Sequence, residues 1–237
     1  MVSLLALSVA GCSTYYPPGA KADLQAFAPT NIQAGFAAKP TSPFPASIAV
    51  VRVQAPDYGN YYIDRHGGRH GAGRYSVITA REVEDQAQFD RISALPRVAG
   101  LVTLNRLLLS GTLEDDRQLR EAAARLQADL VFLYTFETAF YDIDAAKPLS
   151  VITLGLSPTR RITATTTASG LLLDTRTGYI YSAYEVTETE ATLSSSWSSG
   201  DTADECRRKT ERQAFAKLVN EFIASWPMLL QRHDHQP

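Results

Sequence analysis

The chain has 237 residues, of which 45% are hydrophobic, 20% charged and 9% aromatic. This balance is typical of a folded globular protein and excludes fibrous, collagen-like and fully disordered classes. The 23 Lys and Arg residues nearly balance the 25 Asp and Glu residues, and the net charge is -2. Because no overall positive field exists to hold a nucleic acid duplex, we expect no nucleic acid partner.

Residues 1–14, MVSLLALSVAGCST, form a short apolar run that ends in small residues and a cysteine. The run is shorter than the roughly 20 residues that a spanning helix needs, but it has the pattern of an export signal. The motif Val9-Ala10-Gly11-Cys12 resembles the lipobox of bacterial lipoproteins. The resemblance implies a signal peptide over residues 1–11 and a mature chain that begins at Cys12. The alternative is an apolar N-terminus of a cytosolic protein.

By the same resemblance, Cys12 carries a covalent diacylglycerol and a fatty acid, and we expect no other cofactor. Two acyl chains anchor a protein stably without crossing the bilayer. Ser13 follows the cysteine where an Asp would mark retention in the inner membrane. We therefore expect a location in the bacterial cell envelope, at the outer membrane and facing the periplasm.

Residues 12–45 are rich in Pro, Ala, Gly and Ser, which indicates a lipidated N-terminus followed by a flexible tether. A flexible segment of that length spans roughly 30 Å and, fully extended as polyproline, about 100 Å. Once Cys12 is lipidated, Cys206 has no partner for an intramolecular disulfide. An inert, partly buried thiol is the favoured interpretation of Cys206, over an intermolecular disulfide or a reactive nucleophile.

The folded domain is expected over residues 46–231, followed by a disordered tail over residues 232–237. Its first half predicts a buried strand at 48–53, a loop or hairpin at 57–75, a strand at 76–80, a helix at 82–95, a strand at 100–110 and a helix at 113–127. The five glycines of residues 57–75 argue against any stable helix there.

The second half predicts a buried strand at 130–136, a hairpin of strands at 160–173 and 179–192 that turns at Gly178, and a long helix that begins at Asp201 or Thr202. Apolar residues from Phe215 to Trp226 recur every three or four positions, so this helix must pack on the sheet. The fold class is α/β (α+β): one mixed-sheet sandwich in the order strand, helix, strand, helix, strand, hairpin, helix.

This order of elements, the helix that runs through Ala128-Asp129 into an apolar strand, and the hairpin at residues 171–178 resemble a group of periplasmic lipoproteins. They are the lipoproteins of the curli-secretion and penicillin-binding-protein-activator type. The resemblance covers residues 46–226 and implies an α/β sandwich. The loop at 57–75 and the long excursion at 139–159 depart from that pattern.

Known catalytic and nucleotide-binding motifs are missing from the sequence: no G-x-S-x-G, Walker loop, H-E-x-x-H or C-x-x-C occurs. We therefore predict no catalytic residue and no metal site. The alternation of Glu188 and Glu190 with threonine is typical of a solvated strand face, although paired carboxylates are also what a hydrolase uses. The pairs Asp204/Arg208 and Glu205/Lys209 are interpreted as surface ion pairs on the last helix.

The loop at residues 57–75 is the strongest candidate for a binding surface in the sequence, because tyrosine and arginine are the side chains that carry most binding energy in interfaces. The alternative is that its tyrosines pack on the sheet and its arginines only solubilise the loop. The candidate partner-binding residues are Tyr58, Tyr61, Tyr62, Arg65, Arg69, Arg74 and Tyr75.

The sequence thus predicts a membrane-anchored envelope lipoprotein that acts as a non-catalytic binding and assembly module, an adaptor. Its expected partner is an envelope protein or a cell-wall component, with contact to the membrane through the lipid anchor only. The first alternative is a subunit of an oligomeric outer-membrane secretion or envelope complex, with self-association of the chain. A cell-wall hydrolase is the second.

Overall fold

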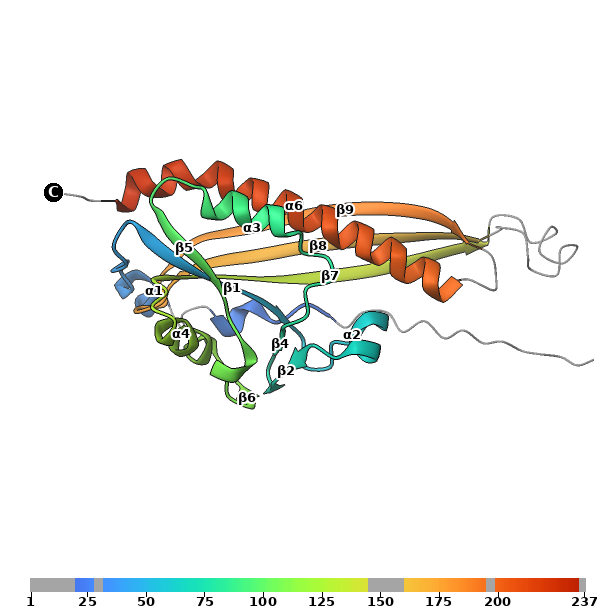
Figure 1. The fold of residues 1–237 in the computed structure, drawn as a ribbon, viewed down its shortest axis with the longest axis horizontal. Helices are drawn as coiled ribbons and strands as arrows, with labels where there is room; N and C mark the ends of the chain where they lie inside the picture. Colours follow the sequence, from blue (N-terminus) through green and yellow to red (C-terminus); the bar gives the residue numbers. More distant parts are fainter. Residues whose placement is uncertain (1–19, 28–31, 145–159, 195–198, 235–237) are drawn as a thin grey trace, which may run out of the picture.

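The computed structural model describes residues 20–27, 32–144, 160–194 and 199–234. The lipobox and its Cys12 lie outside these ranges. A seven-stranded mixed sheet runs through the molecule in the order β2-β4-β1-β7-β8-β9, with β5 also paired to β1 (Figure 1). Its strands are β1 (Ala46–Gln54), β2 (Arg69–His70), β4 (Ser76–Ile78), β5 (Val98–Thr103), β7 (Leu130–Asp144), β8 (Arg160–Asp174) and β9 (Ile180–Ser194). Two short strands, β3 (Ala72–Gly73) and β6 (Thr112–Leu113), pair with each other.

The central strand β1 is parallel to β7 and β5 and antiparallel to β4, whereas β7, β8 and β9 form an antiparallel meander. The β1–β7 ladder ends at the pair Val51–Leu133. Beyond it, the Gln54 amide continues the pairing: its Nε2 donates to the Phe136 carbonyl and its Oε1 accepts from the Phe136 amide. The predicted mixed α/β class is confirmed.

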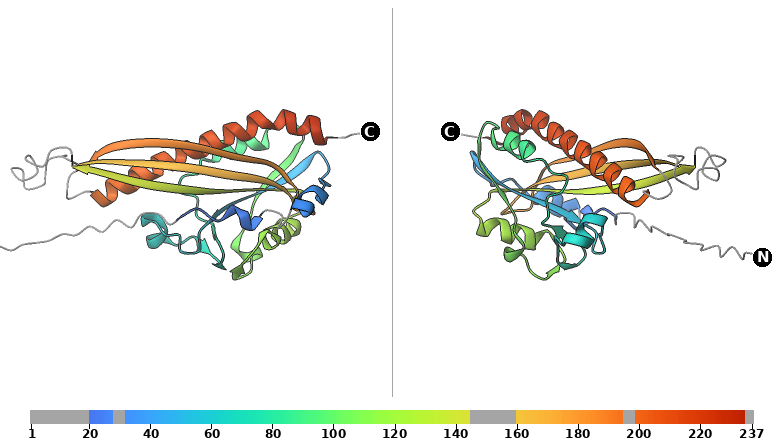
Figure 2. Two further views of the ribbon diagram at one scale, coloured as in Figure 1. Left: turned by 180° about the vertical axis from the view of Figure 1, so that it is seen from behind. Right: turned by 45° about the vertical axis from the view of Figure 1, so that its right-hand side comes forward.

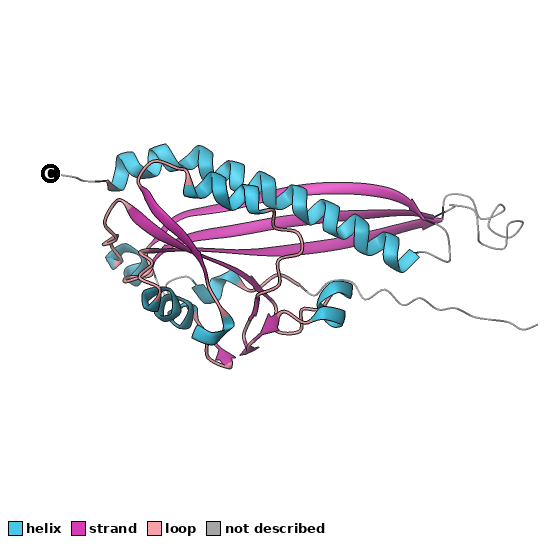
Figure 3. Ribbon diagram, viewed as in Figure 1, coloured by secondary structure: helices cyan, strands magenta, loops and turns pink. Residues whose placement is uncertain are grey.

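One face of the sheet is covered by α6 (Ser199–His233) and α3 (Gln86–Ser93), as Figure 3 shows. Aromatic rings fill the space between helix and sheet, with Phe132 4.9 Å from Phe222 between ring centroids. Phe222 in turn stacks on Trp226, whose indole N–H donates to the Pro96 carbonyl at 2.8 Å. The apolar periodicity of the last helix therefore serves this core, as expected.

The described part of the chain covers only one half of the opposite face of the sheet (Figure 2). There α4 (Asp116–Arg125) and the 3-10 turn η1 (Leu24–Phe27) pack on the sheet. Leu119 and Phe27 are buried against Val51 and Val131, so the sheet has a second, smaller core. The remaining helices are α1 (Ile32–Ala37), α2 (Tyr61–His66) and the 3-10 turn η2 (Arg106–Leu108).

The flexible tether predicted for residues 12–45 is wrong for much of its second part. Ala22 is fully buried, and Phe27 and Phe44 are 2% and 8% exposed. The Asp174 carboxylate holds the end of this segment, since its oxygens accept from the backbone amides of Thr41 at 2.7 Å and Ser42 at 2.8 Å. Prolines limit regular structure here to the short helices η1 and α1, but they do not prevent burial of the apolar side chains of the segment.

The disordered tail predicted for residues 232–237 is wrong for its first three residues. Helix α6 continues to His233, whose ring lies 5.0 Å from that of Tyr181. Asp234 then forms a paired hydrogen bond with Arg97, at 2.9 Å from both Nε and Nη2. Residues 235–237 lie outside the described part of the chain.

The expected loop at residues 57–75 contains a helix, α2. Its glycines flank the helix and do not interrupt it, because Gly59 precedes the N-cap and Gly67 ends the helix with a φ of 74°. Asn60 caps the first turn by accepting a hydrogen bond from the Ile63 amide at 2.8 Å. Strand β5 is also shorter than expected, since η2 occupies residues 106–108.

Candidate functional site

A buried network of charges lies between the sheet and α6 and fixes the segment that carries α2. Arg207 of α6 is fully buried and binds three carboxylates: Glu82 in a bidentate pair with both contacts at 3.0 Å, Asp204 at 2.9 Å and Glu211 at 2.8 Å. Burial alone would lower the pKa of Arg207, but Glu211 and Glu82 outweigh it, so the guanidinium stays charged.

A second buried guanidinium, Arg52 of β1, extends the network to the loop before α2. Its Nη1 lies 3.3 Å from Glu84, and its Nη2 donates to the Tyr58 hydroxyl at 2.8 Å. Asn60 joins the two halves, since its amide donates both to Tyr58 and to Glu82. The residue that caps α2 is therefore held from below by buried charges, and α2 cannot shift without breaking them.

The described part of this network holds two guanidiniums against four carboxylates, of Glu82, Glu84, Asp204 and Glu211. Burial raises the pKa of Glu211 above its usual range, although Arg207 and Arg52 oppose that shift. Burial also raises the pKa of Tyr58 to about 12, so this hydroxyl stays protonated near neutral pH. The sequence prediction missed these charges; the only signal was an arginine inside an apolar strand, at Arg52.

The outer side of α2 carries stacked cationic and aromatic side chains. The Arg65 guanidinium lies 4.0 Å from the centre of the Tyr61 ring, and the Tyr62 and His66 rings stack at 4.4 Å. A hydrogen bond to Asp201 raises the pKa of Tyr61 and ties α2 to the first turn of α6. The tyrosine rings are half-buried and the arginine is exposed.

The seven candidate binding residues do not form one surface. Arg69 joins α2, because it is exposed and its Nη1 donates to the Tyr58 carbonyl at 3.0 Å. Arg74 sits elsewhere, beside β6, and pairs at 3.7 Å with Asp23 of the N-terminal segment. We define the α2 surface as Tyr61, Tyr62, Arg65 and Arg69.

Two of the candidates belong to the core, so the expectation of exposed rings is wrong for them. Tyr58 and Tyr75 are each 1% exposed. Tyr58 is part of the buried charge network, and Tyr75 packs 5.0 Å from Phe27 while its hydroxyl donates to the Asp115 carbonyl. Tyrosine carries both an apolar ring and a polar group, so sequence alone cannot separate a core role from a surface role.

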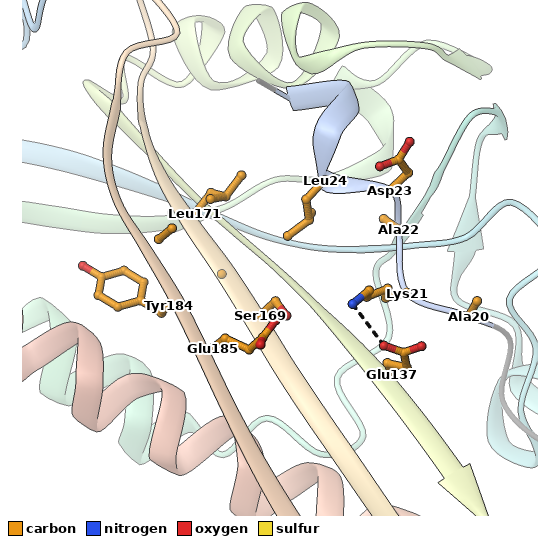
Figure 4. A pocket seen from close by; sticks show the side chains of 12 residues that line it. Ala20, Lys21, Ala22, Asp23, Leu24, Glu137, Ser169, Leu171, Tyr184 and Glu185 are labelled. Atoms are coloured by element: carbon orange, nitrogen blue, oxygen red, sulfur yellow. Dashed lines mark hydrogen bonds and ion pairs between the residues drawn. The ribbon is translucent and has the colours of Figure 1, made fainter. Parts of the chain in front are cut away.

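A groove of about 720 Å³ lies between residues 20–24 and the strands β7, β8 and β9 (Figure 4). Its floor is apolar and includes Leu24, Leu171 and Ala183. Its rim is polar: Lys21 pairs with Glu137 at 3.1 Å, and the exposed carboxylate of Glu185 accepts from Ser169 at 3.2 Å. An apolar side chain with a cation beside it would fit this combination of floor and rim.

Several predicted surface groups turn out to be engaged by α6. Glu188 and Glu190 face the helix and pair with Lys217 at 2.6 Å and Lys209 at 3.0 Å, so the predicted solvated face is wrong for them. Threonines 187 and 189 occupy the outer face. Asp204 pairs with Arg208 as expected, but it is buried rather than on the surface.

Cys206 is 4% exposed, and its thiol lies 3.5 Å from the Glu190 carbonyl. Burial raises its pKa, which disfavours the reactive thiolate. Within the described ranges, no three His, Cys, Asp or Glu side chains are placed to share a metal ion. None of the helices in that part of the chain combines the length and apolar character of a membrane span.

No protein-family profile and no curated protein matches this chain. Among solved structures, a Xanthomonas campestris protein of family DUF330 is 13% identical, with 84% of this chain and 94% of that one covered and a TM-score of 0.38. A neuraminyllactose-binding hemagglutinin homolog from Helicobacter pylori is 10% identical, with 79% and 89% covered and a TM-score of 0.33. At these values neither similarity supports a functional conclusion.

Proposed function

We propose that the chain is a lipid-anchored lipoprotein of the bacterial envelope whose domain acts as a non-catalytic adaptor. In this proposal the α2 surface binds an acidic segment of an envelope protein. The observation that carries it is the exposed Arg65 stacked on the half-buried Tyr61 ring, on a short helix that buried charges hold in place. A surface that is already ordered loses little conformational entropy when a partner binds.

The chemistry of the α2 surface favours an acidic protein segment. Arg65 and Arg69 supply two exposed cations, and Tyr61 and Tyr62 supply flat rings. Arginine pairs bidentately with carboxylates, and the rings give apolar contact area at low entropic cost. A binding role without turnover also agrees with the carboxylates of Glu188 and Glu190, which are occupied by lysines.

The anchor is tested by replacing Cys12. Because the acyl chains supply the membrane affinity in this proposal, the variant Cys12→Ala is expected to move from the membrane fraction to the soluble fraction of lysed cells. A Cys206→Ala variant serves as the control, since its buried thiol carries no lipid and the protein should stay on the membrane. Membrane association that persists in Cys12→Ala would rule out the anchor.

The partner is tested by crosslinking in intact cells followed by capture of this chain. The double variant Tyr61→Ala/Arg65→Ala is expected to recover about tenfold less of one specific envelope protein than the native chain does. Arg91→Ala removes an exposed arginine from α3 and should leave recovery unchanged. An identical partner profile for the double variant and the native chain would overturn the assignment of the α2 surface.

A further inference from the structure

The second half of the β7–β8–β9 meander leaves one face uncovered in the described structure. Cross-strand pairing places Ala139, Thr165 and Thr189 in one row on that face. The next rows toward either end of β8 are centred on Thr163 and Thr167, and the alternate residues Ala164 and Thr166 are buried under α6. We call this the open face; it runs along β8 from Thr167 to Arg161, and the row of the buried Ser169, which ends in the exposed Glu185, borders it.

The middle of the open face is flat and uncharged. Its threonine hydroxyls are bonded to one another, with Thr165 and Thr189 oxygens 3.0 Å apart and Thr167 and Thr187 oxygens 3.0 Å apart. Their hydrogen-bonding capacity is therefore partly used within the sheet. Small side chains with paired hydroxyls suit a face that packs against another sheet, at the usual separation of about 10 Å.

The two ends of the open face differ in charge and shape. The end near the N-terminal segment carries the exposed carboxylate of Glu185, the ion pair Lys21–Glu137 and the apolar-floored groove. The far end carries Arg161 together with Tyr141 and Leu193, which are each 62% exposed. Within the described residues, neither Arg161 nor Glu185 has an oppositely charged partner.

We propose that the open face binds the open face of a second copy of this chain, with the two β8 strands antiparallel. A two-fold axis through Thr165 then places the basic end of each copy over the acidic end of the other. Arg161 of one copy comes beside Glu185 of its partner, and Tyr141 and Leu193 come toward the partner's groove. A parallel arrangement would instead place like charges together, and the two-fold arrangement closes at two copies.

The dimer should be weak in dilute solution. Three two-residue steps along β8 make the face about 20 Å long, and three strands make it roughly 14 Å wide, which is less than a standard stable interface. We therefore expect a transient dimer that dissociates on dilution. This inference goes beyond the adaptor function and is independent of it, because the open face and the α2 surface share no residue.

The proposal is tested by a single cysteine placed on the two-fold axis. In the full chain, Thr165→Cys is expected to yield a dimer with a bismaleimide that spans about 10 Å, the distance between packed sheets. Arg91→Cys, on α3 and away from the open face, should not yield one. The chain without an added cysteine controls for reaction at Cys12 and at the buried Cys206, so the result does not depend on lipidation.

Exchange of the charges tests the two-fold arrangement itself. In the Thr165→Cys background, Arg161→Glu and Glu185→Arg are each expected to lower the crosslinked fraction at least fivefold, and the two together to restore it. Arg161 and Glu185 are exposed and Thr165 is only partly buried, so the variants should keep the native circular dichroism spectrum and melting temperature. Absence of a Thr165→Cys dimer, a crosslink to a different protein only, or failure of the double exchange to restore the dimer would overturn the proposal.

Discussion

At the scale of single residues, the unusual feature is the pair of fully buried arginines, Arg52 and Arg207. Both are paired with carboxylates, whose opposite charge compensates for the water that burial removes, although the buried Nε of Arg52 has no hydrogen-bond partner among the described residues. Such a network contributes little net stability compared with an apolar core. Removal of one member is nevertheless destabilising, because it leaves its partners as buried charges without a counter-charge or water. In this protein the network fixes the relative positions of β1, the α2 segment and α6, because it joins all three.

Replacement of Arg207 by Met should lower the free energy of unfolding by about 3–5 kcal/mol, since Glu82, Asp204 and Glu211 lose their cation. Without it, the folded-state pKa of Glu211 rises further above its unfolded value, so the loss grows as pH rises from about 4.5. Urea unfolding at pH 5 and pH 8 measures this.

The control for that prediction is Arg117→Met, which removes an exposed arginine paired with Glu121 on α4. Exposed pairs contribute little, so we expect a change below about 1 kcal/mol and no dependence on pH. If Arg207→Met lowers the free energy of unfolding no more than the control does, or if its effect shrinks as pH rises, then Arg207 does not compensate buried carboxylate charges.

At the scale of elements, local periodicity predicted the type and order of the longer elements β1, α3, β5, α4, β7, β8, β9 and α6, and most errors in these lie at the ends. The strands β7 and β9 run to 15 residues each, beyond the predicted 130–136 and 179–192. In the outer halves of these strands the alternation of apolar and polar side chains is weak, because one face of the sheet packs on no core in the described structure and carries small side chains. The helix α2 was missed because the surrounding glycines dominated the composition, although Asn60, a preferred N-cap residue, was a local signal for it.

The C-terminal end of α6 gives a test at this scale. Deletion of residues 232–237 removes the His233 contacts with Tyr179 and Tyr181 and the Arg97–Asp234 pair, so the free energy of unfolding should fall by ~1–2 kcal/mol. Deletion of residues 235–237 alone should leave it unchanged. Equal melting temperatures for both truncations would restore the interpretation of a disordered tail from residue 232.

At the scale of the whole molecule, burial of the N-terminal segment changes how far the domain can stand from a bilayer. Ala20 lies eight positions after Cys12, and Ala22 is already in the core. Eight extended residues reach at most about 28 Å. If the lipid anchor of the proposed function is correct, the domain works close to the membrane, well short of the roughly 100 Å that a 33-residue tether would permit.

This arrangement predicts different effects for two phenylalanines of the segment. Phe27→Ala should cost about 3 kcal/mol of unfolding free energy, because the ring is 2% exposed and packs on Tyr75. Phe36→Ala, a matched change at a ring that is 86% exposed, should cost almost nothing. Thermal unfolding of both variants measures the difference, and equal melting temperatures would show that the segment is a free tether.

The sequence predicted some residues of the candidate site correctly, and only the tertiary structure revealed the others. Sequence reasoning found Tyr61, Tyr62, Arg65 and Arg69, which the structure groups around α2, because exposed arginines and tyrosines stand out in a glycine-rich stretch. It also included Tyr58 and Tyr75, which are buried. It could not find the open face, since the exposure of Thr165 or Leu193 depends on whether another element covers that side of the sheet.

The amino-acid sequence alone therefore determined the class of the fold and the order of its elements. It could do so because the hydrophobic periods of helices and strands are local properties that can be recognised within ten to fifteen neighbouring residues. Tertiary structure alone decided which tyrosines are core, which charges are buried together, and that residues 20–45 belong in part to the domain. Those outcomes depend on contacts between residues far apart in the chain, such as Ala22 with Thr135 and Glu82 with Arg207. Only the folded chain brings such residues together.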